Sequence, residues 1–231
     1  MSTPDHRTRV AAEKRERMRM RLIESALHVF AQKGADAAVI EDVIALAEVS
    51  RGTFYNYFRT NEELLAAVVK ELGDELLVLV EAVVTQCKDP AERLACGLRM
   101  TLHTMRAHPL LAQFVARSGL SMATSNSLAM AYLPRDIQAA MASGRFNLGS
   151  VEVGLTLVLG TAHAAIVAMS LPQALSSSLP ANYPEEVIFQ LLLGLGMTKA
   201  QARKLVSTPI TPVEFPEQAL LARTRPDATL A

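Results

Sequence analysis

Apolar residues recur at intervals of three and four along most of the chain, the spacing that places them on one face of an α-helix. Three stripes of this kind occur near the N-terminus: Leu22, Ile23, Ala26, Leu27 and Phe30; Ile40, Val43, Ile44 and Ala47; and Leu64, Val68, Leu72, Leu76 and Val80. No segment alternates apolar and polar residues as a half-buried strand does. The pattern therefore predicts an all-α fold.

Capping residues indicate where the N-terminal helices begin and end. The first helix is expected to stop near Gly34, and Ser50 is suited to cap a short helix that runs to Phe58, because a serine hydroxyl accepts a backbone N–H at that position. Thr60-Asn61-Glu62-Glu63 has the capping-box pattern, in which the Thr hydroxyl and the Glu carboxylate each accept a backbone N–H. It opens a long fourth helix.

The second half of the chain predicts further helices between proline, glycine and capping residues. Their predicted limits are Asp89-Pro90 to His108-Pro109, Pro134 to Gly144, Val151 to Leu171, Pro184 to about residue 196, and Thr198 to Val206. Residues 118–127 are rich in Ser, Thr and Asn and predict a loop. The last 25 residues hold four prolines and predict an extended or disordered tail.

Charge and cysteine content narrow the class of protein. The chain of 231 residues carries 23 Lys and Arg against 23 Asp and Glu, which argues against a polybasic protein that coats nucleic acid indiscriminately. Residues 1–21 nevertheless hold seven basic and three acidic residues, and a basic arm before a compact domain is one way to reach phosphates. The charged N-terminus shows no signal peptide, and two cysteines are too few for a disulfide scaffold. We therefore expect a cytoplasmic protein.

Residues 39–58 have the layout of a helix-turn-helix, in which one short helix crosses the DNA backbone and a second lies in the major groove. Phe54 and Phe58 lie four apart and supply the buried face of the second helix. The side chains left outward or to the flank are Arg51, Gly52, Thr53, Tyr55, Asn56 and Arg59. Arginine reads guanine, asparagine suits adenine and a threonine methyl meets thymine, while the hydroxyls of Tyr55 and Tyr57 reach phosphate.

Three runs of residues carry a likeness to a known family: Ala26-Leu27-x-x-Phe30-x-x-x-Gly34, Val49-Ser50-Arg51-Gly52-Thr53-Phe54-Tyr55-Asn56-Tyr57-Phe58, and Thr60-Asn61-Glu62-Glu63-Leu64-Leu65. Over residues 17–72 the chain resembles the tetracycline-repressor (TetR) family of bacterial transcriptional regulators. The resemblance implies a homodimer that binds a near-palindromic operator and represses nearby genes until a small ligand releases it. The positions matching the family's DNA contacts are Arg51, Gly52, Thr53, Tyr55, Asn56 and Tyr57.

Three departures from the family pattern lower the expected affinity for phosphate. Val39 and Ile40 stand where the family often places threonine, and Glu48 replaces the usual turn glycine. Asn61 replaces a frequent phosphate-binding lysine and is kept among the predicted DNA contacts. We expect a basic flexible arm, residues 1–16, to offset these losses.

The predicted domains are the arm, a helix-turn-helix domain over residues 17–72, a helical ligand-binding and dimerisation domain over residues 73–206, and a proline-rich tail over residues 207–231. The helices over residues 90–143 supply methionines for an adaptable apolar pocket, so we expect a small lipophilic inducer. The predicted ligand contacts are Met100, His103, Thr104, Phe114, Arg117 and Met141, with Met105, Met122, Met130, Gln113 and Asn126 as further candidates.

Residues 153–171 contain no formal charge and leave two interpretations open. Their length and hydropathy permit a transmembrane helix, which gives the alternative function of a membrane-anchored interaction protein. They also contain Gly154 and Gly160, which let two helices approach closely, and they lack an aromatic belt. The family resemblance implies that residues 150–171 and 184–196 of each subunit form a four-helix dimer interface, so we expect a homodimer without membrane contact.

The sequence predicts no enzyme, no cofactor and no metal site. It has no Walker loop, dinucleotide fingerprint or GxSxG elbow. His103 and His108 are five residues apart and do not share a helical face, which argues against a metal pair. Cys87 and Cys96 leave a redox-sensing regulator open as a minor alternative.

Overall fold

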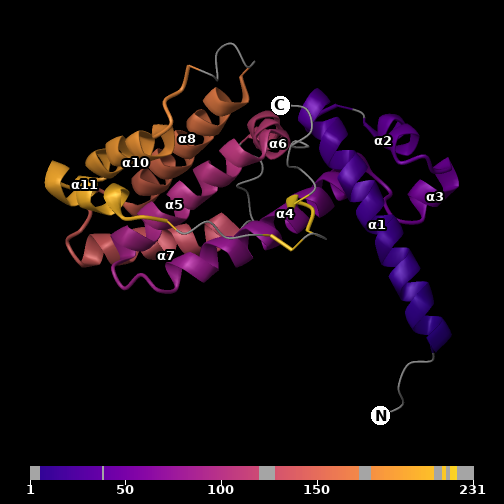
Figure 1. Cartoon of the computed structure of the whole chain (residues 1–231), viewed down its shortest axis with the longest axis horizontal. Helices are drawn as coiled ribbons and strands as arrows, with labels where there is room; N and C mark the ends of the chain where they lie inside the picture. Colours follow the sequence, from indigo (N-terminus) through magenta and orange to yellow (C-terminus); the bar gives the residue numbers. More distant parts are fainter. Residues whose placement is uncertain are drawn as a thin grey trace.

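The computed structural model describes residues 6–37, 39–119, 128–171, 178–210, 215–216 and 219–222, whose regular elements are α-helices (Figure 1). The N-terminal helices are α1 (His6–Lys33), α2 (Ile40–Leu46), α3 (Arg51–Tyr55) and α4 (Asn61–Val84). They are followed by α5 (Pro90–Ala107), α6 (Pro109–Ser118), α7 (Leu128–Ala142), α8 (Val151–Ser170), α10 (Tyr183–Gly194) and α11 (Lys199–Ser207). The all-α prediction is confirmed.

The first helix is longer than predicted. α1 runs for 28 residues from His6, so residues 6–16, expected to be a flexible arm, continue the helix instead. Ala, Arg, Glu and Lys dominate these turns, and all four have high intrinsic helix propensity. Figure 1 shows the N-terminal half of α1 projecting beyond α2 and α3. Residues 1–5 lie outside the described residues.

Several predicted helix limits are confirmed by their capping bonds. The Ser50 hydroxyl accepts the Thr53 backbone N–H at 3.0 Å, and the Thr60 hydroxyl accepts the Glu63 N–H at 3.1 Å. The Glu63 carboxylate accepts the N–H of Arg59, one residue before the cap, at 2.8 Å. Thr198 opens α11 with a complete capping box. Gly34, with φ +90°, follows the end of α1.

The N-terminal helices contact the rest of the molecule through α4 and α6. α4 belongs to both parts, with Leu64 and Val68 fully buried in its first turns. Phe30 of α1 packs on Phe114 of α6 with ring centroids 6.3 Å apart. The position of α1 to α3 therefore depends on α4 and α6.

The limits of the middle helices differ from the prediction. Pro134 lies inside α7 rather than at its start, because the helix-forming residues before it extend the helix. The helix tolerates the one backbone hydrogen bond that proline removes. α6, whose limits no sequence pattern marked, begins at Pro109 directly after α5. Most of the predicted loop over residues 118–127 lies outside the described residues.

The prediction of an extended or disordered tail is wrong for its described residues. Ala219, Leu220 and Leu221 are buried, and the N–H groups of Leu220 and Leu221 donate to the two carboxylate oxygens of Glu75 at 2.6 and 2.8 Å. Phe215 lies edge-on to the ring of buried His108, with centroids 5.6 Å apart. Apolar burial and hydrogen bonds to a charged acceptor offset the entropy lost when the segment is ordered.

Candidate nucleic-acid interface

α3 divides its side chains between a core and an exposed face, as the sequence predicts. Phe54 is fully buried and lies 6.1 Å from Phe58, centroid to centroid. Tyr55 meets Phe54 edge-on at 5.4 Å and is 44% exposed. Asn56 caps the C-terminus of α3 and is exposed. The apolar face thus holds the helix in the core while Arg51, Tyr55 and Asn56 stay exposed.

The first turn of α3 combines a strong cap with an open surface. The hydroxyls of Ser50 and Thr53 lie 2.8 Å apart, which fixes the side chain of half-buried Thr53. A side chain at Gly52 would meet only Ser50 Oγ, at 3.9 Å. The fold itself does not require glycine there, so close approach of a DNA backbone remains the predicted reason for it.

Tyr57 and Asn61 take positions different from that of Tyr55. Tyr57 is half-buried, with the Arg15 guanidinium 5.8 Å from its ring centroid. Asn61 Nδ2 donates to the carbonyls of Ala35 and Ala37 at 3.3 and 3.1 Å, and its Oδ1 is buried without a partner among the described residues. The Asn61 amide therefore holds the turn between α1 and α2, which leaves little basis for the predicted phosphate contact.

Val39 and Glu48 show the consequences of the departures noted in the sequence. Val39 precedes α2 without a side-chain cap and is fully buried, so its apolar side chain joins the core instead of reaching a phosphate. Glu48 has φ +50°, a left-handed conformation that costs a residue with a side chain free energy. Its carboxylate lies 3.3 Å from the Arg21 guanidinium.

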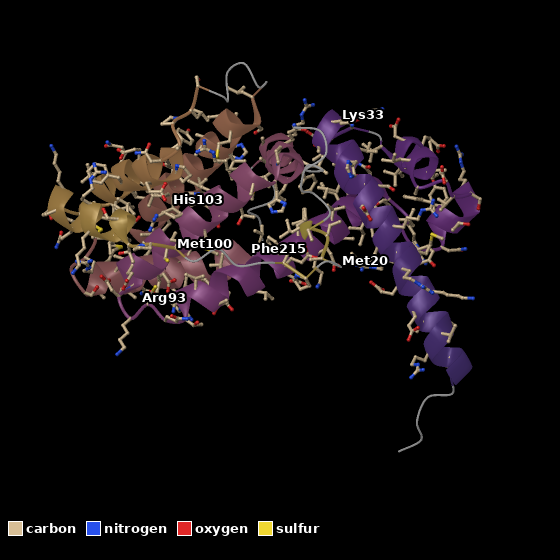
Figure 2. All side chains as sticks on the ribbon, viewed as in Figure 1. Met20, Lys33, Arg93, Met100, His103 and Phe215 are labelled. Carbon is tan, nitrogen blue, oxygen red and sulfur yellow. The ribbon has the colours of Figure 1, made fainter. Side chains whose placement is uncertain are left out.

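Two further ion pairs lie on the helix-turn-helix. Arg51 Nη2 donates to Glu41 Oε1 at 2.7 Å, and Lys33 Nζ donates to Asp42 Oδ2 at 2.8 Å. Figure 2 shows Lys33 near the C-terminal end of α1. Glu41 and Asp42 of α2 thus each pair with a basic side chain of a neighbouring helix.

The six predicted ligand contacts lie on α5, α6 and α7 and stay a prediction. Phe114 is fully buried against Phe30, and Arg117 donates to the carbonyl of Gln32. Met100 is buried and Thr104 half-buried in α5, and Met141 is half-buried in α7. Figure 2 shows Met100 and His103 along α5.

His103 belongs to an ion network that the sequence analysis missed. Its Nε2 lies 2.8 Å from Glu185 Oε1, which also accepts Arg99 Nη2 at 3.1 Å. Arg99 is 5% exposed and donates to the carbonyls of Leu205 and Thr208. Burial alone would raise the pKa of Glu185, but hydrogen bonds from His103, the backbone and Arg99 outweigh it and lower the pKa. The network joins α5, α10 and α11.

α8 and α10 border an open hollow of about 380 Å³. Its lining residues are Gly160, Thr161, Ala164, Ala165, Tyr183 and Val187, none of which is among the predicted ligand contacts. α8 is long and apolar enough to cross a membrane by length and composition, and 22% of an 18-residue stretch of it is buried within the single chain. Val153 and Val167 are 49% and 37% exposed.

Cys87 lies in the turn between α4 and α5, Cys96 lies in α5, and both are partly buried. Burial raises the pKa of Cys87 to about 11, with the nearby Cys96 thiol adding to the shift. Burial also raises the pKa of Cys96. Because the thiolate is the reactive form, the pair is poorly suited to rapid oxidation at neutral pH.

Both halves of the chain match models of known protein families. Residues 22–68 match the family model described as bacterial regulatory proteins, tetR family. Residues 89–208 match the model described as tetracyclin repressor-like, C-terminal domain. The first match covers the helix-turn-helix with the adjoining parts of α1 and α4, and the second covers α5 to α11.

Curated relatives match part of the chain. An uncharacterised HTH-type transcriptional regulator of Mycobacterium tuberculosis (strain H37Rv) is 33% identical over 110 residues, 46% of this chain and 49% of the relative. The HTH-type transcriptional repressor DhaR of Mycobacterium sp. (strain GP1) is 29% identical over 76 residues, 33% of this chain and 38% of DhaR. The chain thus spans about half or less of the length of these relatives.

Solved structures match over most of their length. The crystal structure of RolR in complex with resorcinol has a TM-score of 0.60 and 28% identity, covering 88% of this chain and 100% of RolR. A gamma-butyrolactone receptor (ArpA-like protein) has a TM-score of 0.53 and 17% identity, covering 91% of this chain and 99% of the receptor. The second likeness concerns the fold alone.

Proposed function

Because the chain belongs to the TetR family of bacterial transcriptional regulators, we propose that it is a ligand-responsive repressor that binds a near-palindromic operator as a dimer. The observation that carries the proposal is that α3 buries one face and exposes the other. Its apolar face, with Phe54, is used in the core, while Tyr55 and Asn56 are exposed beside Arg51. These residue types suit base edges and phosphates. No catalytic role is proposed, and the repressor acts in the bacterial cytoplasm.

We propose that dimerisation uses α8 and α10, the predicted segments 150–171 and 184–196. Support comes from the exposed apolar side chains of α8 and from small residues such as Gly160, which permit close helix packing. A second copy would cover this apolar face in water. The alternative of a membrane anchor predicts instead that the protein needs detergent, so size-exclusion chromatography without detergent distinguishes the two.

The proposed inducer is a small, lipophilic, aromatic molecule bound among the helices of the C-terminal domain. Support comes from RolR, which is 28% identical, matches along its whole length and was crystallised with resorcinol. Binding would be coupled to DNA through α4, which runs from the helix-turn-helix into the C-terminal domain. A shift of α4 would move the two recognition helices away from the spacing of about 34–36 Å that successive major grooves require.

The experiment is footprinting of the purified protein on the DNA upstream of its own gene, with and without resorcinol and related phenols. We expect one protected site with two half-sites about one helical turn apart and loss of protection with an active phenol. Uniform, weak protection along the fragment would contradict operator binding. Protection that no phenol relieves would contradict only the proposed class of inducer.

A further inference from the structure

The ion pair between Glu41 and Arg51 connects the two helices of the helix-turn-helix. Glu41 is the second residue of α2 and Arg51 is the first residue of α3. Arg51 Nη2 donates to Glu41 Oε1 at 2.7 Å, and the two side chains are 67% and 63% exposed. The pair therefore sits on the surface, at the end of α3 that enters a groove first.

Stability does not explain this pair. Exposed ion pairs contribute little to folding, because solvent screens them and two long side chains must be ordered. A carboxylate close to DNA also repels phosphates and lowers affinity for every sequence. Glu41 thus lowers the affinity for DNA of any sequence. The pair is explained if Glu41 instead controls the orientation of Arg51.

A carboxylate partner restricts the orientation of an arginine without using all of its donors. Guanidinium carries five N–H donors in one plane, and the pair with Glu41 engages Nη2. The remaining donors are available to a guanine edge, which arginine reads through two parallel hydrogen bonds. An arginine held in one plane loses less rotamer freedom on binding than an unrestrained one.

We propose that Glu41 is a positioning residue that determines specificity: it orients Arg51 to read a base in the operator. This inference rests on the proposed DNA-binding function and identifies a residue that sets its sequence preference. Removing the carboxylate should raise affinity for DNA of any sequence, because a negative charge is lost, and should weaken discrimination at the base pair that Arg51 reads.

The chain supplies a matched control in Asp42. Asp42 follows Glu41 on the same helix and pairs with Lys33 of α1 at 2.8 Å, away from α3. Asp42→Asn therefore removes the same charge from the same helix without releasing Arg51. Glu41→Asp completes the set, because it keeps the charge and withdraws the carboxylate by one methylene.

The test is fluorescence anisotropy on the operator and on its single base-pair variants. We expect Arg51→Ala to abolish discrimination at one base pair, and Glu41→Gln and Glu41→Asp to reduce it there by about three- to tenfold. Asp42→Asn should change affinity for all variants equally. In the Arg51→Ala background, Glu41→Gln should cause no further loss of discrimination.

Either of two results would overturn the inference while leaving operator binding intact: unchanged discrimination in both Glu41 variants, or discrimination that Arg51→Ala does not alter. If the unmodified protein binds operator and scrambled DNA equally, the proposed function fails, and the inference fails with it. Circular dichroism melting of each variant shows whether a loss reflects unfolding, and Glu41→Asp keeps the test available if Glu41→Gln does not fold.

Discussion

Single residues were predictable where helix periodicity decides their environment. Phe54 and Phe58 lie four apart and are buried, and the same spacing leaves Tyr55 and Asn56 exposed. Asn61 could not be placed this way, because its partners are backbone carbonyls 24 and 26 positions earlier in the chain. A residue's distant partners follow from packing, which a local pattern does not contain.

Asn56→Ala tests the exposed face of α3. We expect the affinity for operator to fall by about 1–3 kcal/mol, the range for a contact that reads a base, because the substitution removes the amide that suits adenine. The midpoint of thermal unfolding and the dimer seen by size exclusion should not change, since Asn56 is exposed. Tyr55→Phe is the milder companion: it keeps the ring on Phe54 and removes the hydroxyl. Unchanged operator affinity in both variants would contradict the assignment.

Glu48→Gly tests the strained turn between α2 and α3. A side chain at positive φ costs roughly 1–2 kcal/mol, and glycine avoids this strain. Glycine also loses more backbone entropy on folding, which offsets about 0.5–1 kcal/mol of the gain. We therefore expect a rise of up to about 1 kcal/mol in the free energy of unfolding, measured in urea. Glu48→Gln keeps the strain and removes only the pair with Arg21, so it should change stability by less than about 0.5 kcal/mol. A Glu48→Gly protein less stable than Glu48→Gln would contradict this account.

Whole elements were predicted best where an apolar stripe or a cap marks them. α8 has both, and its start is capped by Ser150, whose hydroxyl accepts the Val153 N–H. The first three turns of α1 have neither, because residues 6–16 are mostly charged. A polar helix that extends beyond the core leaves no periodic signal, and it was therefore predicted as a flexible arm.

Deletion of residues 1–16 tests the role of this basic helical extension. We expect a clear loss of affinity for operator at moderate salt, together with a shallower dependence of the dissociation constant on KCl, because each lost phosphate contact lowers the slope by about one unit. Arg9→Gln with Lys14→Gln is the control that keeps the helix and removes two exposed charges of the deleted segment. Full-strength binding by the deletion protein would show that the extension does not compensate for Val39, Glu48 and Asn61.

The division of the whole molecule into a DNA-binding part and a helical C-terminal part followed from the sequence, but its long-range packing did not. The six predicted ligand contacts come from α5, α6 and α7, and none of them lines the hollow between α8 and α10. The tail packs on a helix 145 residues earlier in the chain, where Glu75 accepts the Leu220 N–H. The four prolines predicted an extended or disordered tail, because the composition of the tail does not show that α4 offers a surface on which it packs.

Glu75→Gln tests the docking of the tail on α4. A neutral amide accepts the two backbone N–H groups more weakly than a carboxylate does, so we expect the free energy of unfolding to fall by about 1–3 kcal/mol. Chymotrypsin should then cleave near Phe215 faster than in the unmodified protein. Asp74→Asn, which removes an exposed carboxylate from the preceding position of α4, should change neither. Equal cleavage rates for all three proteins would contradict a docked tail.

The proposed function requires a dimer that recognises a specific DNA sequence through α3. The most direct measurement is the fluorescence anisotropy of the purified protein on its upstream fragment and on a scrambled fragment of the same composition, with excess competitor DNA. The account predicts saturable nanomolar binding to the upstream fragment, at two protomers or a multiple of two per site, and binding to the scrambled fragment at least about a thousandfold weaker. Equal affinity for the two fragments would contradict it.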